Sequence, residues 1–235
     1  MRRYLSLCLS VLMVFPGCAS YTARPASAPK MAAMPFLRIE NSVMVAVDPY
    51  IQPDRQREVF DAELMKTLGV LPLYLSVENR GERELSLERS AIALELPDGR
   101  QISSVQSETV ARRLEVKHAV SKGGGGGLGA LGVGLIEGLS VLAANAAEKR
   151  ATEARVADYG NKEFQDVVLS KNASAHGFVY FMPPAGTLWS TKARLALRFV
   201  DKKDGTSFAV RVPVSESGFF KEGIVDPKKE DPTSK

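Results

Sequence analysis

Side chains able to do catalytic or metal chemistry are few in this sequence. It holds two histidines, His118 and His176, and no HExxH pair or cysteine-rich spacing that could complete a zinc site. The hydroxyl-rich stretch SVQSETVARR has no suitably spaced base, and the GGGGG run lacks the ending of a phosphate-binding loop. We therefore expect no catalytic residue, no metal and no cofactor, and we predict that the chain is not an enzyme.

Cys18 is the residue whose side chain is best placed for a covalent modification. It follows Arg2, Arg3 and an apolar run from Tyr4 to Phe15, which is the layout of a secretory signal peptide. The run is shorter than the roughly 20 apolar residues that cross a bilayer. Removal of residues 1–17 would leave Cys18 as the first residue and the sole cysteine of a 218-residue chain, so no intramolecular disulfide could form.

The residues Phe15-Pro16-Gly17-Cys18 resemble the lipobox of bacterial lipoproteins, in which a small residue precedes an acylated cysteine. The resemblance implies lipid on Cys18 and an anchor in the membrane of the cell envelope. Ala19 is not the aspartate that is associated with retention in the inner membrane, so the resemblance favours the outer membrane, with the protein facing the periplasm. A plain secretory signal with an incidental cysteine is the alternative.

Alternating apolar residues separated by turn residues fill most of the remaining sequence. Valines alternate between Ile39 and Val47, and leucines and valines between Val70 and Val77, while Pro97-Asp98-Gly99 is typical of a hairpin turn. Seven or eight such runs favour a mainly β, antiparallel sandwich, with one face of each strand on a core and the other toward water. The runs LPLYLSVENRG and HGFVYFMPPAG resemble strand pairs of immunoglobulin-like and fibronectin-like envelope domains.

Composition divides the chain into four parts. Residues 1–17 are the predicted signal peptide, and residues 18–36, rich in Ala, Ser and Pro, are a predicted flexible tether. Residues 37–220 form the predicted immunoglobulin-like β-sandwich, with a helical insertion at about 119–160, and residues 221–235 form a predicted disordered tail. Short helices are also candidates at 54–68 and 104–114.

The stretch GGGGGLGALGVGLIEGLSVL, residues 123–142, has the spacing of a sided helix. Its leucines recur at helical intervals, and beside them runs a row of small residues at four-residue intervals. One helix is predicted from about 128 to 157, ending near Gly160, where glycine can cap it. The predicted contact residues are Leu128, Leu131, Gly134, Leu135, Gly138 and Leu142.

Three interpretations of this stretch remain open from the sequence. The leucine face packs on the protein's own sheet, or the glycine row pairs with a second copy, a protein partner or the membrane surface, or the stretch is a low-complexity linker. Fifteen helical residues reach about 22 Å, short of the roughly 30 Å hydrocarbon core. The helix is therefore not expected to span a bilayer alone.

Charge and motifs together favour a binding role. The formal net charge of +4 falls to +2 without Arg2 and Arg3, and the basic residues are scattered, so no nucleic acid partner is expected. The leading hypothesis is a lipid-anchored, non-catalytic envelope lipoprotein that binds a partner or supports assembly. A glycine-zipper lipoprotein that forms oligomers or enters the membrane is the second hypothesis, and an envelope enzyme of unusual architecture is the third.

Overall fold

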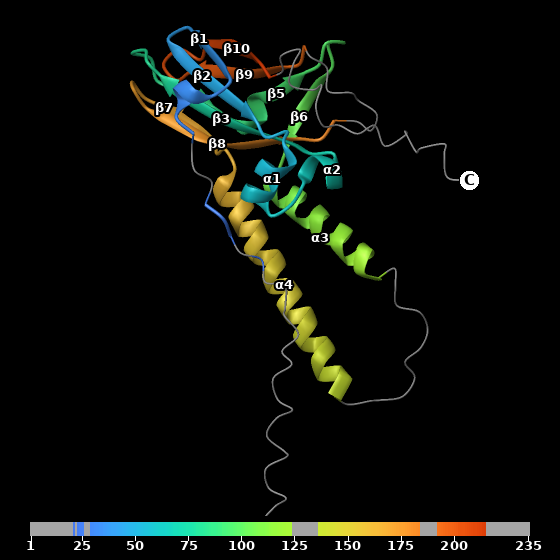
Figure 1. The fold of residues 1–235 in the computed structure, drawn as a ribbon. Coiled ribbons are helices and arrows are strands. Elements are labelled where there is room, and N and C mark those ends of the chain that lie inside the picture. Colours follow the sequence, from blue (N-terminus) through green and yellow to red (C-terminus); the bar gives the residue numbers. More distant parts are fainter. Residues whose placement is uncertain (1–20, 22, 26–28, 124–135, 184–191, 215–235) are drawn as a thin grey trace, which may run out of the picture.

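The computed structural model describes residues 21, 23–25, 29–123, 136–183 and 192–214, with backbone only for residues 118–123 and 136–148. In that part of the chain, ten strands alternate with a few helices (Figure 1). The strands are β1 (Phe36–Glu40), β2 (Val43–Pro49), β3 (Leu71–Asn79), β4 (Leu85–Leu87), β5 (Ile92–Glu95), β6 (Gln101–Val105), β7 (Val167–Leu169), β8 (Ser174–Phe181), β9 (Arg194–Asp201) and β10 (Ser207–Pro213). The helices are α1 (Pro53–Phe60), α2 (Leu64–Leu68), α3 (Ser107–Gly123) and α4 (Ile136–Lys162), with 3-10 turns η1 (Met31–Ala33) and η2 (Arg89–Ala91).

The strands form two antiparallel layers that share one strand. The first layer has the order β1-β2-β3-β8-β6, and the second has the order β6-β5-β9-β4-β7, with β10 on the other edge of β9. β6 joins them because Ser104 and Val105 pair with β8 while Ser103 to Gln101 pair with β5. At the opposite side β10 lies against β1. The mainly β, antiparallel, sandwich-like architecture predicted from the sequence is therefore confirmed.

The space between the two layers is filled by aliphatic side chains and phenylalanine. β3 contributes Leu71, Leu73, Leu75 and Val77 to this inner core, at the period-two spacing that places alternate side chains on one face. β9 contributes Leu195, Leu197 and Phe199 from the facing layer. Twenty-four buried apolar residues form this cluster, and their removal from water stabilises the packing of the two layers.

The outer face of the first layer is also covered, which differs from the expectation that it would face water. Tyr74 of β3 and Phe178 and Tyr180 of β8 project outward into a second cluster, together with Phe60 of α1 and Tyr159 of α4. Consequently every residue of β2 is buried, and nearly every residue of β3. The alternation of the sequence could not show this cover, because aromatic residues that face a helix and those that face solvent alternate in the same way.

The predicted strand around 39–47 is two strands joined by a tight turn. Asn41 and Ser42 both have positive φ, at 50° and 62°, as a two-residue hairpin turn with matching twist requires. The short loop pairs Glu40 with Val43 and so fixes the register of β1 on β2. The predicted hairpin at Pro97-Asp98-Gly99 is confirmed, and Gly99 takes a φ of 83° there.

The two long helices form a hairpin that leaves the sandwich (Figure 1). α3 begins at Ser107, three residues after the predicted start, because Ser104 and Val105 belong to β6. α4 continues past Gly160 to Lys162, so the predicted glycine cap is wrong. The helix continues because Tyr159 is buried against Phe60 and Tyr180, and this packing outweighs the preference of glycine for a helix end.

Candidate functional site

Most of the predicted lipidation and contact residues lie outside the part of the chain that the structure describes. Cys18 precedes it, and Leu128, Leu131, Gly134 and Leu135 lie in the undescribed stretch 124–135. Gly138 and Leu142 belong to α4, where the backbone is helical. Lipidation and contact through this stretch therefore stay predictions, and the polar side-chain networks that the structure describes lie nearer the base of the hairpin.

The segment that follows the predicted anchor docks on α4. The hydroxyl of Tyr21 donates a short hydrogen bond to Asp158, and the guanidinium carbon of Arg155 lies 4.6 Å from the centre of the Tyr21 ring. Lys162 donates to the same carboxylate at 2.5 Å. Asp158, Arg155 and Lys162 are each buried, so these contacts form in a poorly hydrated environment where they are stronger than at a surface.

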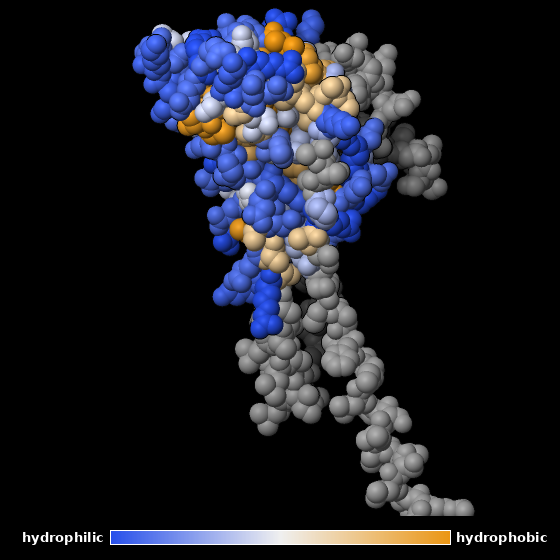
Figure 2. Space-filling model, turned by 90° about the vertical axis from the view of Figure 1, so that its left-hand side faces the viewer, coloured by the Kyte–Doolittle hydropathy of each residue, from blue (hydrophilic) through white to orange (hydrophobic). Residues whose placement is uncertain are grey.

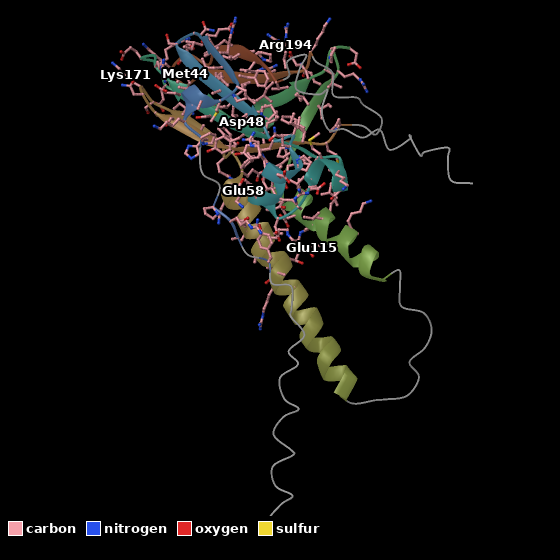
Figure 3. The ribbon with its side chains drawn as sticks, in the orientation of Figure 1. Met44, Asp48, Glu58, Glu115, Lys171 and Arg194 are labelled. Atoms are coloured by element: carbon pink, nitrogen blue, oxygen red, sulfur yellow. The ribbon has the colours of Figure 1, made fainter. Side chains whose placement is uncertain are left out.

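The same buried charges connect the two helices of the hairpin to each other and to α1. Arg155 of α4 pairs with Glu115 of α3, which is labelled in Figure 3. The ammonium of Lys162 donates to the carbonyl of Val59 at 2.7 Å, and the hydroxyl of Tyr159 donates to the carbonyl of Phe60 at 2.7 Å. Those carbonyls lie at the end of α1, where no helical N–H is left to satisfy them. One network therefore holds α1, α3, α4 and the N-terminal segment together.

The N-terminal segment runs from the hairpin toward the sheet. After Tyr21 on α4, Arg24 donates to the carbonyl of Arg57 and pairs with Asp61 at the end of α1. Met31 and Met34 then pack in the outer cluster before β1 begins at Phe36. The described part of the predicted tether is thus fixed along the helical layer at several points.

Burial controls the ionisation of the tyrosines in this layer. The pKa of Tyr21 is raised well above its usual value, first by loss of hydration and then by its hydrogen bond to the Asp158 carboxylate. Burial likewise raises the pKa of Tyr159 and Tyr180, and it raises the pKa of Tyr74 to about 12. All of these hydroxyls stay protonated at neutral pH, and Tyr21 acts as a hydrogen-bond donor.

A polar cleft of about 320 Å³ lies at the base of the hairpin, between the start of α3 and the end of α4. At its centre, Glu163 pairs with Arg89, and its carboxylate accepts bonds from the Ser107 amide at 3.0 Å and the Ser107 hydroxyl at 2.8 Å. Asp166 accepts from the Arg89 amide at 2.7 Å. A carboxylate at the first turn of a helix accepts a hydrogen bond from an N–H that has no partner within the helix. The partial positive charge at that end of the helix stabilises the carboxylate.

This serine–carboxylate pair is built as a helix cap. Ser107 is 3% exposed, which leaves its hydroxyl little access to a substrate, and Arg89 neutralises the carboxylate that would have to act as a base. The position of Glu163 is further fixed from the sheet side, because the Phe164 amide donates to the Phe178 carbonyl at 2.9 Å. The cleft therefore serves to fix the hairpin on the sandwich.

Gly177 allows this close approach. A Cβ atom at Gly177 would lie 2.6 Å from the backbone nitrogen of Phe164 and 2.7 Å from its Cα, which is closer than real side chains come. Glycine is thus required on β8 because the chain after α4 crosses directly over it.

The described residues show neither a metal-binding cluster nor a membrane-spanning helix. They contain no group of three or more His, Cys, Asp or Glu side chains that could hold a metal ion. None of their helices combines the length and apolar character that a membrane crossing requires.

Sequence reasoning missed the docking network. Tyr21 lies in an Ala-, Ser- and Pro-rich stretch whose composition indicates a free tether, and its partner is 137 residues away. The spacing of Asp158 and Lys162, four residues apart on a helix, was the available local signal. It predicts an ion pair, but nothing in it shows that the pair is buried or that a tyrosine joins it.

Comparison with known proteins adds little to this geometry. No family model matches the sequence, and no curated protein is similar to it. Among solved structures, the fold is similar to that of a functionally unknown protein from Listeria monocytogenes EGD-e, with 12% identity, a TM-score of 0.35, and 77% of this chain and 82% of that chain covered. A similarity this distant assigns no function.

Proposed function

We propose that this protein is a lipid-anchored lipoprotein of the bacterial cell envelope that acts as a non-catalytic binding or assembly module. Lipid on Cys18 would hold it in the outer membrane, with the sandwich in the periplasm. The proposed contact surface is the tip of the hairpin, including Gly138 and Leu142, and it would take a protein partner or the membrane.

The observation that carries this proposal is the docking of Tyr21 on α4. A segment that serves only as a spacer has no reason to form a hydrogen bond to a buried carboxylate, because ordering it costs about 1–2 kcal/mol per residue in backbone entropy. The bond places the residue three positions after Cys18 on the element that projects furthest from the body (Figure 1). An anchor at Cys18 and a contact surface on the hairpin would then act together.

The immunoglobulin-like character of the sandwich is part of this proposal. We propose an immunoglobulin-like sandwich, supported by two antiparallel layers around one apolar core and by strands β3 and β8, which carry the resembling runs. In this structure those two strands are direct neighbours in one layer, with Leu75 opposite Gly177.

The experiment is fractionation of cells that express the full chain with Cys18→Ser. We expect the wild-type protein to sediment with outer membranes and the variant to be lost from them, because its hydroxyl cannot carry the thioether-linked lipid. Mass spectrometry of the wild-type protein would show acyl chains on an N-terminal Cys18. A single acyl chain binds membranes only marginally, so firm sedimentation requires more than one.

Cys8→Ser is the matched control, since Cys8 is the other cysteine and lies in the segment predicted to be removed. It should leave both lipid content and sedimentation unchanged. Equal membrane association of the wild type and the Cys18→Ser variant would refute the proposal.

A further inference from the structure

Strand β1 carries charged side chains on its core side and apolar ones on its outer face. β2 directs its valines into the inner core, and Arg38 and Glu40 of β1 lie opposite two of them, on the same side of the sheet. Leu37 and Ile39 lie on the outer face, where they are 43% and 53% exposed. Figure 2 shows hydrophobic residues among hydrophilic ones at the top of the body, the level of β1 in Figure 1. The outer face of β1 is therefore apolar and in contact with solvent.

β1 is also an edge strand. Its backbone pairs with β2, and β10, which lies against it, pairs through its own backbone with β9. Among the described residues, no strand pairs with the other edge of β1. The two-residue turn makes Glu40 and Val43 a hydrogen-bonded pair. Because backbone groups alternate in direction along an antiparallel strand, Leu37 and Ile39 direct their N–H and C=O groups away from β2.

The charges of β1 select how a second strand could pair with this edge. Charged side chains commonly protect an edge strand, because like charges directly opposite each other destabilise a sheet. When two copies of β1 run antiparallel with Ile39 opposite Ile39, Arg38 of each copy lies opposite Glu40 of the other. A shift of this register by two residues places either two Arg38 or two Glu40 side chains opposite each other. The sequence of β1 therefore favours one register of pairing with itself.

We propose that β1 pairs antiparallel with β1 of a second copy of this chain, with Ile39 at the two-fold axis. The backbone N–H and C=O groups of Ile39, which point away from β2, would bond to those of Ile39 in the second copy. The first layers of two sandwiches would then join into one continuous sheet. The two Ile39 side chains would contact each other on the outer face, which removes apolar surface from water.

Symmetry and charge make this contact specific. The two-fold arrangement uses the free edge of both copies, so the contact closes at a dimer. The guanidinium of Arg38 lies 3.7 Å from the Glu40 carboxylate within one chain, and each group would gain an oppositely charged neighbour in the other copy. The surface is separate from the contact residues predicted at 128–142, and it needs no lipid on Cys18.

Cysteine cross-linking tests the register. In cells that express the full chain, Ile39→Cys should give a disulfide-linked dimer on mild oxidation, because Cα atoms of directly opposite residues lie about 4.5–5.5 Å apart. Leu37→Cys is the matched control on the same exposed face. The two copies of residue 37 would lie about 14 Å apart, beyond the reach of a disulfide. The wild type, which keeps Cys8 and Cys18, gives the background.

Charge reversal tests the pairing independently. We expect Arg38→Glu and Glu40→Arg each to raise the dissociation constant of the dimer by about tenfold or more, because each variant places like charges opposite each other. Sedimentation velocity of the purified full-length protein in a nonionic detergent measures this constant. The double variant Arg38→Glu with Glu40→Arg should recover the wild-type value. Both side chains are exposed, at 58% and 40%, so circular dichroism should show an unchanged fold.

Other results would overturn the inference. A cross-linked band for Leu37→Cys as strong as that for Ile39→Cys would indicate random collision or another register. A product of Ile39→Cys whose mass is not twice that of the monomer would show a foreign strand on this edge. A wild type that stays monomeric, or a double variant as weak as the single ones, would exclude the pairing of Arg38 with Glu40. Each outcome is independent of whether Cys18 carries lipid.

Discussion

The two faces of the first β-layer are held by different physical means. The inner core is a cluster of aliphatic side chains and phenylalanine without tyrosine, and it brings together two layers whose strands are already paired. The outer layer contains four buried tyrosines and the half-buried Tyr21, and it is bordered by buried charges, among them Arg155, Asp158 and Lys162. Packing without direction builds the inner core, whereas directional bonds fix the helices and the N-terminal segment. The inner core should therefore respond to lost volume, and the outer layer to lost charge and to pH.

Alkaline pH should give the largest effect and should act on the outer layer. All five described tyrosines lie there, and burial is the leading cause of the raised pKa of each. A raised folded pKa means that stability is complete below the unfolded value of about 10 and is lost as pH rises through the folded value. With Tyr74 at about 12, we expect loss between pH 10 and 12.

Circular dichroism at 222 nm and tyrosinate absorbance, followed together during a pH titration, would measure this loss. The helical signal should fall as the tyrosines ionise, and Tyr74→Phe should make the fall less steep. Tyrosines that all titrate near pH 10 while the helices persist would contradict the buried environment.

Loss of side-chain volume in the inner core should give the second-largest loss of stability. Phe199 of β9 is fully buried and stacks on Phe208 with ring centres 5.4 Å apart. Phe199→Ala should lower the free energy of unfolding by about 3–5 kcal/mol, measured by urea denaturation. Val168→Ala on β7 is the control, since Val168 is 48% exposed and its loss should change stability by less than about 0.5 kcal/mol.

Glu163→Gln should give a smaller loss, located at the junction of the two regions. It keeps the shape of the side chain and removes the charge that pairs with Arg89 and caps α3 at Ser107. Bonds to charged groups contribute about 1.5–3 kcal/mol, and we expect a loss in that range by urea denaturation. Glu82→Gln, in an exposed pair with Lys171, should change stability by less than about 0.5 kcal/mol.

Removal of a single buried hydroxyl from the outer layer should give the smallest change in stability. Tyr159 donates to the Phe60 carbonyl, whereas the hydroxyl of Tyr180 has no hydrogen-bond partner among the described residues. Tyr159→Phe should cost about 1–2 kcal/mol, and Tyr180→Phe should be neutral or stabilising, because it removes an unsatisfied polar group. A thermal-denaturation comparison in which Tyr180→Phe is the more harmful change would contradict this assignment.

Local patterns identified the strands because their signal is local. Period-two spacing in Leu71 to Val77 and the Asp98-Gly99 turn each depend on neighbouring residues, and both features appear in the structure. The split of the 39–47 run was missed because Asn41 and Ser42 can continue a strand or turn it, and pairing of β1 with β2 decides between them. Gly160 was misjudged because burial of Tyr159 outweighs a helix-ending preference of about 1 kcal/mol.

The sequence alone determined a mainly β, antiparallel body, because side-chain alternation and turn chemistry are properties of short segments. Tertiary structure decided which face of each strand is covered and which distant residues meet: Tyr21 with Asp158, Ser107 with Glu163, and Gly177 with Phe164. Such contacts join residues far apart along the chain, so no local pattern records them.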